Sequence, residues 1–416
     1  MDKVKIIICG AGDRGRSHGE NAVKYAKNAE VVGVAEPRAH HRSEVAATHN
    51  IPAENVFTDW REMAASERFA DAVVIATQDN MHVEPVEEFA AKGYHILLEK
   101  PIAPTEQECE RVAQAVKKSG IIFGVCHVLR YTNYTQKIKE ILDAGTIGEI
   151  ASIQHLEPVA YWHQAHSYVR GNWRNEKESS FMLLAKSCHD IDLIHYLMDD
   201  TCTSISSFGA LKHFRHECQP KGAADRCLDC PVEPDCPYSA KKIYLGRLAK
   251  GQTGWPVDVV VPEPTEASLL EALRTGPYGR CVYACDNDVV DNQVVNMKFA
   301  NRQTASFTMT AFTDSPGRQT RIFGTRGQLT GDSSKITIYD FLTDKTTEID
   351  TRASDGHVTG GHGGGDYNLM ERFVEAVRKN DQSLLLSGVD ETLASHRMVF
   401  AAERGRRENR VVELTS

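Results

Sequence analysis

The first 150 residues alternate between strand-like and helix-like segments, and no other feature of the chain limits its fold as much. Short apolar runs bounded by glycine, proline or polar residues have the length of buried strands, and the stretches between them suit helices. We expect strands at 3–10, 29–37, 71–80, 94–101 and 120–130, and helices at 17–27, 42–49, 83–92 and 105–119. Thr105, with Glu108 three residues later, is typical of a helix N-cap. This alternation favours a parallel, doubly wound α/β sheet.

A glycine pattern stands at the first strand-to-helix turn. Gly10, Gly12 and Gly15 in CGAGDRG match G-x-G-x-x-G, which lets the backbone approach a pyrophosphate at the N-terminus of the next helix. An ordinary tight turn without a ligand is the alternative. Glu36 ends the second strand, where a carboxylate accepts hydrogen bonds from the adenosine ribose and repels a 2′-phosphate. This favours NAD over NADP, although Arg38 stands close enough to hold a phosphate.

From Gly148 onward the alternation stops, and the stretches 288–312 and 334–341 are typical of antiparallel strands joined by turns. Helices are expected at 181–198, 367–379 and 391–404. The chain therefore predicts an N-terminal Rossmann domain followed by a C-terminal α+β domain with an open, mainly antiparallel sheet. We place the NAD-binding Rossmann domain at 1–146, the substrate-binding and oligomerisation domain at 147–416, and a Cys-rich insertion near 213–240. The cleft between the domains is the expected substrate site.

Composition narrows the function further. The 416 residues carry 48 lysines and arginines against 57 aspartates and glutamates, a net charge of −9, which argues against a nucleic-acid partner. The apolar runs are of strand length and too short to span a bilayer, so no membrane partner is expected. The chain begins without a basic, apolar, small-residue leader, and its 11 cysteines suit reduced thiols. We therefore expect a cytoplasmic protein.

Three motifs, GAGDRG at 10–15, ATQDNMH at 76–82 and above all LLEKP at 97–101, resemble the glucose–fructose oxidoreductase, inositol dehydrogenase and rhizopine-catabolism (GFO/IDH/MOCA) oxidoreductase family. The resemblance covers the whole chain and is strongest over its first half. It implies a Rossmann domain joined to an open-sheet domain, NAD as cofactor, and a homodimer or homotetramer. Most members are pyranose or polyol dehydrogenases, so a small sugar or glycoside is the expected substrate.

The family pattern also implies roles for individual residues. It places the lysine of the EKP motif, Lys100, against the substrate hydroxyl, and it places Thr77 and Glu99 close to the nicotinamide ribose. The residues expected to bind the cofactor lie in the turns that follow the Rossmann strands: Gly10, Gly12, Asp13, Arg14, Gly15, Glu36, Arg38, Thr77, Gln78, His82, Glu99 and Lys100.

The stretch FMLLAKSCHDIDLIHYLM, residues 181–198, departs from the family pattern. As one helix it is apolar on nearly every side, yet Lys186 and His189 share one face, one turn apart. Burying a lysine and a histidine is costly unless they are paired or used. The family carries an aspartate and, four positions later, a histidine. His189 matches that histidine, but Ala185 stands where the aspartate is expected.

Hydride transfer from an alcohol needs a group that takes the hydroxyl proton. Lys100 and His189 can share this role, and Lys186 beside Lys100 would supply a second cation that eases proton loss and stabilises an oxyanion. We predict these three residues to be catalytic, with Lys186 and His189 facing Lys100 across the nicotinamide. The alternatives are a salt bridge from Lys186 to Asp190 or Glu178, and a satisfied core histidine at 189.

The segment YWHQAHSYVRGNWRN, residues 161–175, concentrates aromatic rings and cations, which suits a sugar ring with an anionic or hydroxyl-rich substituent. An ordinary aromatic surface loop is the alternative. A second polar group ends the last N-terminal strand, where doubly wound sheets bind ligands. Together they give the expected substrate-binding residues: His127, Arg130, Tyr131, Trp162, His163, His166, Arg170, Trp173 and Arg174. Asp366, in the glycine-rich turn 361–366, either caps the next helix or lines the site.

Three functions remain open. The first is an NAD-dependent enzyme of carbohydrate catabolism that transfers a hydride at a ring hydroxyl. The second, implied by a subset of the family, is a redox-neutral NAD-dependent glycosidase that oxidises, eliminates, hydrates and reduces; a sulfosugar or other anionic glycoside would match the Arg- and Trp-rich segment. The third is a non-catalytic NAD-sensing regulator, which would have no need to retain the EKP motif.

A cysteine cluster stands in HECQPKGAADRCLDCPVEPDC, with Cys218, Cys227, Cys230 and Cys236. A C-x-x-C pair with a third and a fourth cysteine nearby resembles a structural zinc site, and two neighbouring histidines are spare ligands. Free thiols in a surface insertion are the alternative. We predict that the four cysteines bind a structural metal, zinc, and take no part in catalysis.

Overall fold

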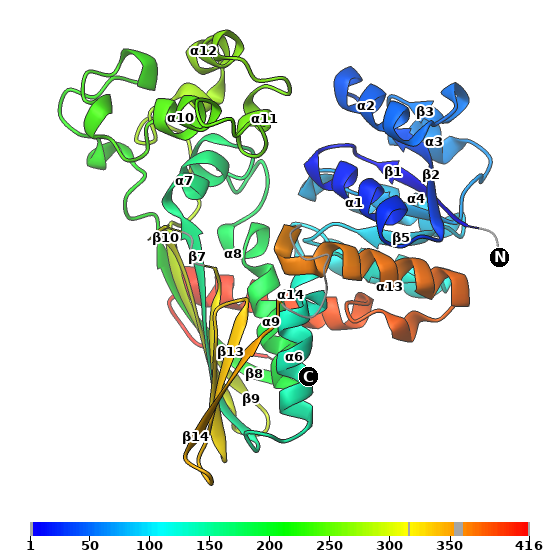
Figure 1. Ribbon diagram of the computed structural model, residues 1–416, viewed down its shortest axis with the longest axis vertical. Coiled ribbons are helices and arrows are strands. Elements are labelled where there is room, and N and C mark those ends of the chain that lie inside the picture. The colour runs from blue at the N-terminus through cyan, green and yellow to red at the C-terminus, as the bar shows by residue number, and fades with distance from the viewer. Residues whose placement is uncertain (1–2, 315–316, 353–360, 415–416) are drawn as a thin grey trace.

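A computed structural model describes residues 3–314, 317–352 and 361–414. Figure 1 shows two bodies side by side: an N-terminal body of helices around a small sheet, and a second body built on a long sheet with a lobe of short helices above it. Within the described residues, no helix is both long enough and apolar enough to cross a membrane.

Six parallel strands form the N-terminal sheet in the order β3-β2-β1-β4-β5-β6. This is the strand order of a Rossmann fold, which binds ligands at the carboxyl ends of β1 and β4, where the order reverses. The strands are β1 Val4–Cys9, β2 Ala29–Ala35, β3 Val56–Phe57, β4 Ala72–Ile75, β5 His95–Leu98 and β6 Phe123–Val125. The predicted parallel, doubly wound sheet is confirmed.

The helices between these strands are α1 Asp13–Lys24, α2 Ala39–His49, α3 Trp60–Ala65, α4 Val83–Ala91 and α5 Glu106–Ser119. Strands that are buried on both faces form uninterrupted apolar runs, which is why the sequence locates them. The Thr105 hydroxyl accepts a hydrogen bond from the Glu108 amide at 3.2 Å, as the predicted N-cap requires. The last strand is shorter than predicted, because the chain enters a 3-10 turn, η3 Val128–Tyr131, soon after β6.

Two glycines let α1 start directly against the end of β1. Gly10 has a φ of +90°, a left-handed conformation that favours glycine. A Cβ at Gly15 would lie 1.9 Å from the Gly10 carbonyl oxygen. At Gly12, where φ is −66°, a Cβ would meet only Arg38 Nη2, at 3.4 Å. The first and third glycines therefore shape the turn, and Gly12 faces the space where a pyrophosphate fits.

Nine strands form the second sheet in the order β14-β13-β12-β11-β7-β10-β9-β8-β15. Only β7 and β10 pair in parallel; the other neighbours are antiparallel. The strands are β7 Ile150–Ala160, β8 Cys202–Ala210, β9 Asn292–Phe299, β10 Thr304–Thr313, β11 Gln319–Gly324, β12 Gly327–Gly331, β13 Lys335–Asp340, β14 Lys345–Asp350 and β15 Val412–Glu413. The predicted open, mainly antiparallel sheet is confirmed.

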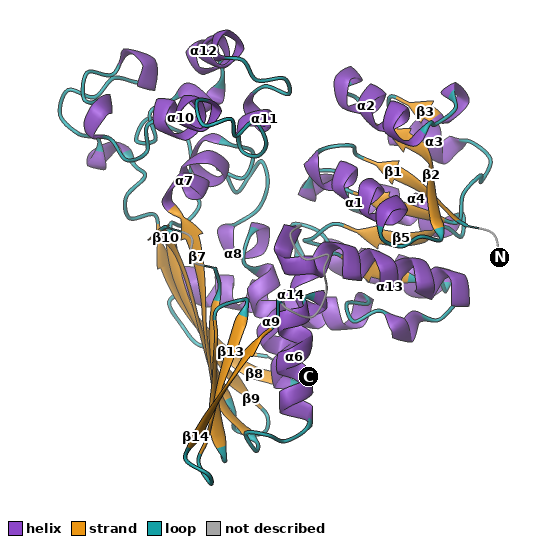
Figure 2. Ribbon diagram, viewed as in Figure 1, coloured by secondary structure: helices purple, strands orange, loops and turns teal. Residues whose placement is uncertain are grey.

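Helices cover one face of this second sheet (Figure 2). They are α6 Asn133–Asp143, α8 Met182–Ala185, α9 Cys188–Met198 and α14 Val389–Glu408. On β9, Val295, Met297 and Phe299 are buried, whereas Val294, on the other face, is 39% exposed. This alternation is what a sheet covered on one face requires.

Helix α13, Gly365–Lys379, follows the second sheet in the sequence but lies along the Rossmann domain (Figure 1). Its Leu369, Met370 and Phe373 pack in one apolar cluster with Ile6 and Leu97 of the parallel sheet. The C-terminal part of the chain thus adds a layer to the N-terminal domain. The division into 1–146 and 147–416 stays a prediction.

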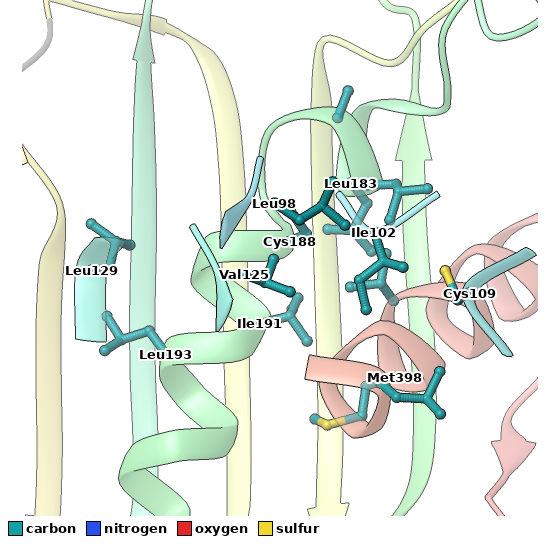
Figure 3. Packing of buried hydrophobic residues seen from close by; sticks show 14 of the residues in the cluster. Leu98, Ile102, Cys109, Val125, Leu129, Leu183, Cys188, Ile191, Leu193 and Met398 are labelled. Atoms are coloured by element: carbon teal, nitrogen blue, oxygen red, sulfur yellow. The ribbon is translucent and has the colours of Figure 1, made fainter. Parts of the chain in front are cut away.

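A continuous apolar core joins the two bodies (Figure 3). Leu98 and Val125, at the ends of β5 and β6, pack with Cys188 and Ile191 of α9 and with Met398 of α14. Because burial of apolar surface is the main favourable term in folding, this contact fixes α9 against the carboxyl ends of the Rossmann strands. The EKP motif follows β5 at this edge of the sheet.

The chain between β8 and β9, residues 211–291, forms the lobe of short helices above the second sheet (Figure 1). Its helices are η5 His216–Cys218, η6 Cys227–Asp229, η7 Glu233–Asp235, η8 Lys241–Leu245, α10 Gly246–Leu248, α11 Val257–Val260, α12 Glu266–Thr275 and η9 Pro277–Gly279. The lobe is longer than the predicted insertion at 213–240, because Leu273 and Tyr283 belong to the same apolar cluster as Phe214 and Tyr244.

We expect Gly15→Ala to destabilise the apoprotein and Gly12→Ala to leave its stability almost unchanged. The added methyl at 15 meets a backbone carbonyl, whereas at 12 it meets only the flexible end of Arg38. Overpacking of this kind costs about 1–3 kcal/mol. Urea denaturation should therefore give clearly different free energies of unfolding for the two variants, and equal values would contradict the described packing of the turn.

Candidate active site

The nucleotide side of the site comprises the turn after β1 and the end of β2. Glu36 is 2% exposed, and its Oε2 accepts a hydrogen bond from the Ala11 amide at 2.8 Å. Arg38 donates to the same carboxylate from Nε at 2.7 Å and from Nη2 at 3.0 Å. Burial alone would raise the pKa of Glu36, but the hydrogen bonds from Arg38 outweigh burial and lower it. An ionised carboxylate is thus held beside the glycine turn, where the adenosine ribose is expected.

Glu99 links the glycine turn to the EKP turn. Its Oε1 accepts a hydrogen bond from Arg14 Nε at 2.6 Å and lies 2.7 Å from His18 Nε2, and its Oε2 accepts from the Lys100 amide at 3.1 Å. Arg14 Nη2 also donates to Asp366 Oδ1 at 2.6 Å, which ties α13 to the same point. Burial alone would raise the pKa of the Glu99 carboxyl, but Arg14 and His18 hold it well below its usual range. Arg14 and Glu99 therefore brace the turn that carries Lys100, and their contacts with a cofactor stay predictions.

The other predicted cofactor residues lie in the turns after β1 and β4. Asp13 and Gln78 are exposed. The Thr77 hydroxyl donates to a carbonyl oxygen of its own turn at 3.1 Å. His82 is fully buried: its Nδ1 lies 2.8 Å from the Pro101 carbonyl oxygen, and its Nε2 lies 3.2 Å from that of Thr77. His82 therefore holds two turns together from inside, and its predicted contact with the cofactor stays a prediction.

The predicted single helix over 181–198 is broken in two. α8 ends at Ala185, and α9 starts three residues later. The last carbonyl groups of a helix have no partner within it, and here the Ala185 carbonyl accepts a hydrogen bond from Lys100 Nζ at 2.6 Å. The prediction that Lys186 and His189 lie one turn apart on one helical face is therefore wrong. Lys100 does reach this segment, across the boundary between the domains.

Lys186 pairs with a buried carboxylate on β7. Its Nζ lies 3.0 Å from Glu157 Oε1, and Arg318 Nε lies 2.9 Å from Oε2 of the same carboxylate. Arg318 Nε is also 2.6 Å from Asp190 Oδ1, which lies 3.0 Å from His155 Nε2. Lys186 thus forms a salt bridge, but not with either carboxylate named in the predicted alternative. Arg318, which no sequence motif marks, joins the group through the turn before β11.

The ring of His163 has a lowered pKa. Burial lowers it well below the ordinary value, and the positive charges of Lys186 and His166 lower it further. Arg318 and Lys100 act in the same direction, so charges from both domains affect this imidazole. A neutral ring can both donate and accept a hydrogen bond, which suits a sugar hydroxyl.

His189 packs against a second buried histidine. The rings of His189 and His127 are edge to face, with centroids 5.7 Å apart, and His127 Nδ1 lies 3.6 Å from Asp192 Oδ2. Burial lowers the pKa of His127 to about 4, so this ring is neutral near pH 7. His127 therefore packs against His189 as a buried, neutral group, and its predicted contact with a substrate stays a prediction.

Arg130 and Tyr131 are also occupied inside the protein. Arg130 is 2% exposed and donates to Asp192 from Nε and Nη2, both at 2.7 Å. The Tyr131 hydroxyl accepts hydrogen bonds from the Leu386 amide at 2.9 Å and the Ser387 amide at 3.1 Å. These residues hold η3 against α9 and the C-terminal segment, and their predicted contacts with substrate stay predictions.

The aromatic segment is helical and not a loop. α7 Tyr161–His163 runs into a π-helix, η4 Gln164–Arg170, and most of the side chains turn toward the lobe at 211–291. The Arg247 guanidinium carbon lies 4.0 Å from the Trp162 ring centroid. His166 Nδ1 lies 2.9 Å from the Tyr244 hydroxyl. Trp162 and His166 therefore contact the lobe, and their predicted contacts with substrate stay predictions.

The end of the segment behaves in the same way. Arg170 Nε donates to the Arg280 carbonyl at 2.7 Å. Arg174 donates to both carboxylate oxygens of Asp286, at 2.9 and 3.0 Å. These two arginines also hold the lobe. Their predicted contacts with substrate, like that of Trp173, which is 36% exposed, stay predictions.

The cysteines of the lobe gather only in part as predicted. Cys227, Cys230 and Cys236 line one small cavity, and the fourth cysteine in its lining is Cys281. The Cys218 thiol lies outside this lining and donates to a backbone carbonyl at 3.6 Å. Three of the four predicted ligands therefore lie together, Cys218 lies apart from them, and metal binding stays a prediction.

A Rossmann domain whose EKP lysine meets the first helices of an open-sheet domain defines a dinucleotide-dependent oxidoreductase. The comparison with family models makes this specific. The model described as "Oxidoreductase family, NAD-binding Rossmann fold" matches residues 4–127, and the model described as "Oxidoreductase family, C-terminal alpha/beta domain" matches residues 139–414. The chain belongs to this GFO/IDH/MocA oxidoreductase family, and the predicted resemblance is confirmed.

Individual relatives are distant. YteT of Bacillus subtilis (strain 168), named as an oxidoreductase, is 25% identical over 318 residues, 72% of this chain and 71% of that protein. The 2,7-anhydro-N-acetylneuraminate hydratase of Escherichia coli (strain K12) is 26% identical over 208 residues, 49% of this chain and 52% of that protein, so the match spans about half of its length. A solved structure of levoglucosan dehydrogenase with NADH and L-sorbose has a TM-score of 0.74 over 100% of both chains at 18% identity, which shows a shared fold.

We expect the free energy of unfolding to rise with pH between about 4 and 6.5. His127 has a pKa of about 4 in the folded protein against an ordinary value of 6.5, so within this window the unfolded chain binds more protons. The contribution is complete above pH 6.5 and lost below pH 4, and it amounts to about 3 kcal/mol. Urea titrations across this range measure it.

The variant His127→Gln should flatten this pH dependence without abolishing it, because buried His396 and His166, whose pKa values are both lowered to about 3, act in the same direction. The exposed His40→Gln serves as the control. An unchanged slope in His127→Gln would contradict the burial of a neutral ring.

Proposed function

We propose that this protein is an NAD-dependent enzyme of carbohydrate catabolism that transfers a hydride at a ring hydroxyl of a sugar or glycoside. The observation that carries the proposal is the hydrogen bond of 2.6 Å from Lys100 Nζ to the Ala185 carbonyl. It puts the ammonium group of the EKP motif at the junction between the nucleotide domain and the second domain. A substrate bound in this junction would lie next to the carboxyl ends of the Rossmann strands.

The residues of the nucleotide side fit a dinucleotide. The turn at Gly10 and Gly15 leaves the helix N-terminus of α1 open for a pyrophosphate, and Glu36 is buried, ionised and placed for a ribose. Bound NAD would supply the hydride acceptor. Side chains of the protein would bind and orient the substrate and would transfer the proton of its hydroxyl.

Lys100 and His189 would handle the proton of the substrate hydroxyl. One hydrogen of the Lys100 ammonium is used by the Ala185 carbonyl, which orients the group and leaves two further donors for a substrate. His189, 7% exposed, is the second acid–base group, and the neutral His127 ring fixes its position. Proton transfer by a positioned group contributes roughly 10²–10⁴ to a rate.

Charged groups at the junction favour an anionic or hydroxyl-rich substituent on the sugar. Lys186 and Arg318 are paired with Glu157 and Asp190. Lys100 Nζ forms no ion pair among the described residues and donates to the Ala185 carbonyl, so its remaining donors can serve such a substituent. The neutral imidazole of His163 adds a hydrogen-bonding group in the same place.

The relatives support a sugar substrate. The hydratase from Escherichia coli acts, by its name, on an anhydro-sugar acid, and the levoglucosan dehydrogenase acts on an anhydro-sugar. Carried over to this chain, both favour a carbohydrate with a closed ring. The particular sugar and the carbon that is oxidised do not follow from this likeness.

The second candidate is the redox-neutral route, in which oxidation, elimination, hydration and reduction give glycoside hydrolysis without net redox change. The name of the hydratase favours it, because addition of water is not a net oxidation. A sulfosugar or another anionic glycoside would suit the ammonium group of Lys100, which forms no ion pair among the described residues. In this route substrate turns over while NADH does not accumulate, so product and NADH measured together under multiple turnover distinguish the two routes. A non-catalytic regulator would give neither.

Assembly and location stay predictions. Phe208 is 57% exposed and pairs across strands with Val294, 39% exposed, on the uncovered face of the second sheet. An apolar pair of this kind favours a homodimer or homotetramer, in which a second subunit covers the face. The predicted cytoplasmic location rests on the sequence alone.

We expect Lys100→Met to lower kcat by about 10²–10⁴ and to leave the Kd for NAD within a few-fold of the wild-type value. The charge acts on the substrate hydroxyl, whereas the dinucleotide is held by the glycine turn and Glu36. A sugar panel followed by NADH absorbance identifies a substrate, and titration measures NAD binding. The exposed Lys118→Met is the control. Near-normal kcat in Lys100→Met would overturn the proposed function.

Lys186 is tested together with its partner. Lys186→Met should lower turnover and also destabilise the protein, because it leaves Glu157 paired only with Arg318. The double variant Lys186→Met/Glu157→Gln removes both charges and should regain stability. We predict that its turnover stays low, since the cation also serves the substrate. If the double variant recovers turnover, Lys186 only neutralises Glu157 and has no role toward the substrate.

We expect the wild-type protein to bind NAD more tightly than NADP, because the ionised Glu36 repels a 2′-phosphate. Glu36→Gln should narrow the difference, since Arg38 then becomes available to a phosphate. Fluorescence titration of the apoprotein with both dinucleotides gives the ratio. Tighter binding of NADP by the wild type would contradict the assignment.

A further inference from the structure

The lobe at 211–291 encloses a small cavity lined by four thiols. They belong to Cys227, Cys230, Cys236 and Cys281, and the charged residues Arg170 and Glu233 also line the cavity. All four cysteines are free, so no disulfide joins them. The cavity stands apart from the candidate active site, within an apolar cluster of the lobe. Four sulfur ligands around one space is the donor set of thiolate-bound metal centres.

The chain brings the fourth cysteine in from far along the sequence. Arg226 and Arg280 form an isolated antiparallel bridge, and the Cys281 amide donates to the Asp225 carbonyl at 2.7 Å. This pairing places Cys281 beside Cys227. The lobe contains no strand of its own, and its helices are only 3 to 10 residues long. A small domain of this kind commonly needs a staple, such as a metal, to hold its shape.

Arg170 gives an independent reason to expect negative charge in the cavity. It is 1% exposed, and its Nη2 donates to the Tyr238 carbonyl at 2.9 Å and to Cys227 Sγ at 3.5 Å. Its Nη1 has no hydrogen-bond partner, and no carboxylate forms an ion pair with it among the described residues; Glu233, which lines the same cavity, is paired with Lys241 at 2.7 Å. A buried guanidinium without a counter-ion is costly. Four metal-bound thiolates carry a net negative charge with either zinc or an iron–sulfur cluster, and that charge would compensate the arginine.

Further N–H groups point at the sulfurs. The Ala224 amide lies 3.5 Å from Cys230 Sγ, and Gln219 Nε2 lies 4.0 Å from Cys281 Sγ. Hydrogen bonds of this kind stabilise thiolates and tune metal centres. Neutral thiols have little use for three N–H donors, whereas metal-bound thiolates accept them.

We propose that Cys227, Cys230, Cys236 and Cys281 bind a thiophilic metal centre, a zinc ion or an iron–sulfur cluster, through four thiolates. The centre staples the lobe and, through Arg170, the helical segment that carries His163. Among the described residues, no three of these sulfurs lie within 4.8 Å of one another. Tetrahedral zinc, with Zn–S of about 2.3 Å, draws its sulfurs closer than that, and a cluster holds them further apart. Both occupants share the thiolate chemistry, and metal analysis separates them.

The test is metal analysis of protein purified without oxygen. Zinc and iron are measured by elemental analysis, sulfide is measured chemically, and visible absorption is recorded. The proposal expects one centre per chain: either zinc without sulfide, or iron with matching sulfide and an absorption band. Wild-type protein free of both metals would overturn it.

Matched variants test the ligand set. Cys281→Ser should lose the metal, and Cys218→Ser, in the same lobe but outside the cavity lining, should retain it. Loss in Cys218→Ser with retention in Cys281→Ser would overturn the assignment. Because a serine variant can misfold, the wild type is also treated with a chelator. Its melting temperature should fall, and return on adding back the metal that the analysis found; an unchanged melting temperature after complete removal would exclude a structural staple.

Discussion

One apolar core, shared by both domains, fixes the geometry of the candidate site. Leu98 and Val125 at the ends of two Rossmann strands pack against Ile191 and Met398 of the second domain (Figure 3). Burial of this surface sets α9 against the EKP turn, so the Lys100 side chain meets a helix end at a fixed distance. Each polar group at the junction must then be paired or used, because an unpaired buried charge is costly.

The charges at the junction divide into two kinds. Arg130 and Asp192 bind each other through two hydrogen bonds, and this pair holds η3 against α9. The other pairs are Lys186 with Glu157 and Arg318 with Asp190 and Glu157. Lys100 differs from them, because its ammonium group forms no ion pair among the described residues and donates to a backbone carbonyl. A cation held in this way keeps donors that a ligand can use.

Local signals in the sequence predicted the local structure. The Rossmann strands are buried on both faces, and the cap at Thr105 needs only Glu108, so both follow from a few neighbouring residues. The carbonyl at the break after Ala185 is bonded by a lysine 85 positions earlier, and a contact of this range leaves no local signal in the sequence. Arg318 and Cys281 were missed for the same reason, since long-range pairing alone brings them to their sites. Aromatic and cationic residues at 161–175 were assigned to substrate, but tertiary packing uses most of them to anchor the lobe.

The central claim is that Lys100 acts on the substrate hydroxyl at the domain junction. A crystal structure of the protein with NAD and the sugar identified by turnover tests it most directly. The account predicts Lys100 Nζ within hydrogen-bond distance, about 2.7–3.2 Å, of the hydroxyl on the carbon that faces the nicotinamide. It also predicts that the contact with the Ala185 carbonyl persists. A sugar bound with no hydroxyl near Lys100, or bound away from the junction, would contradict it.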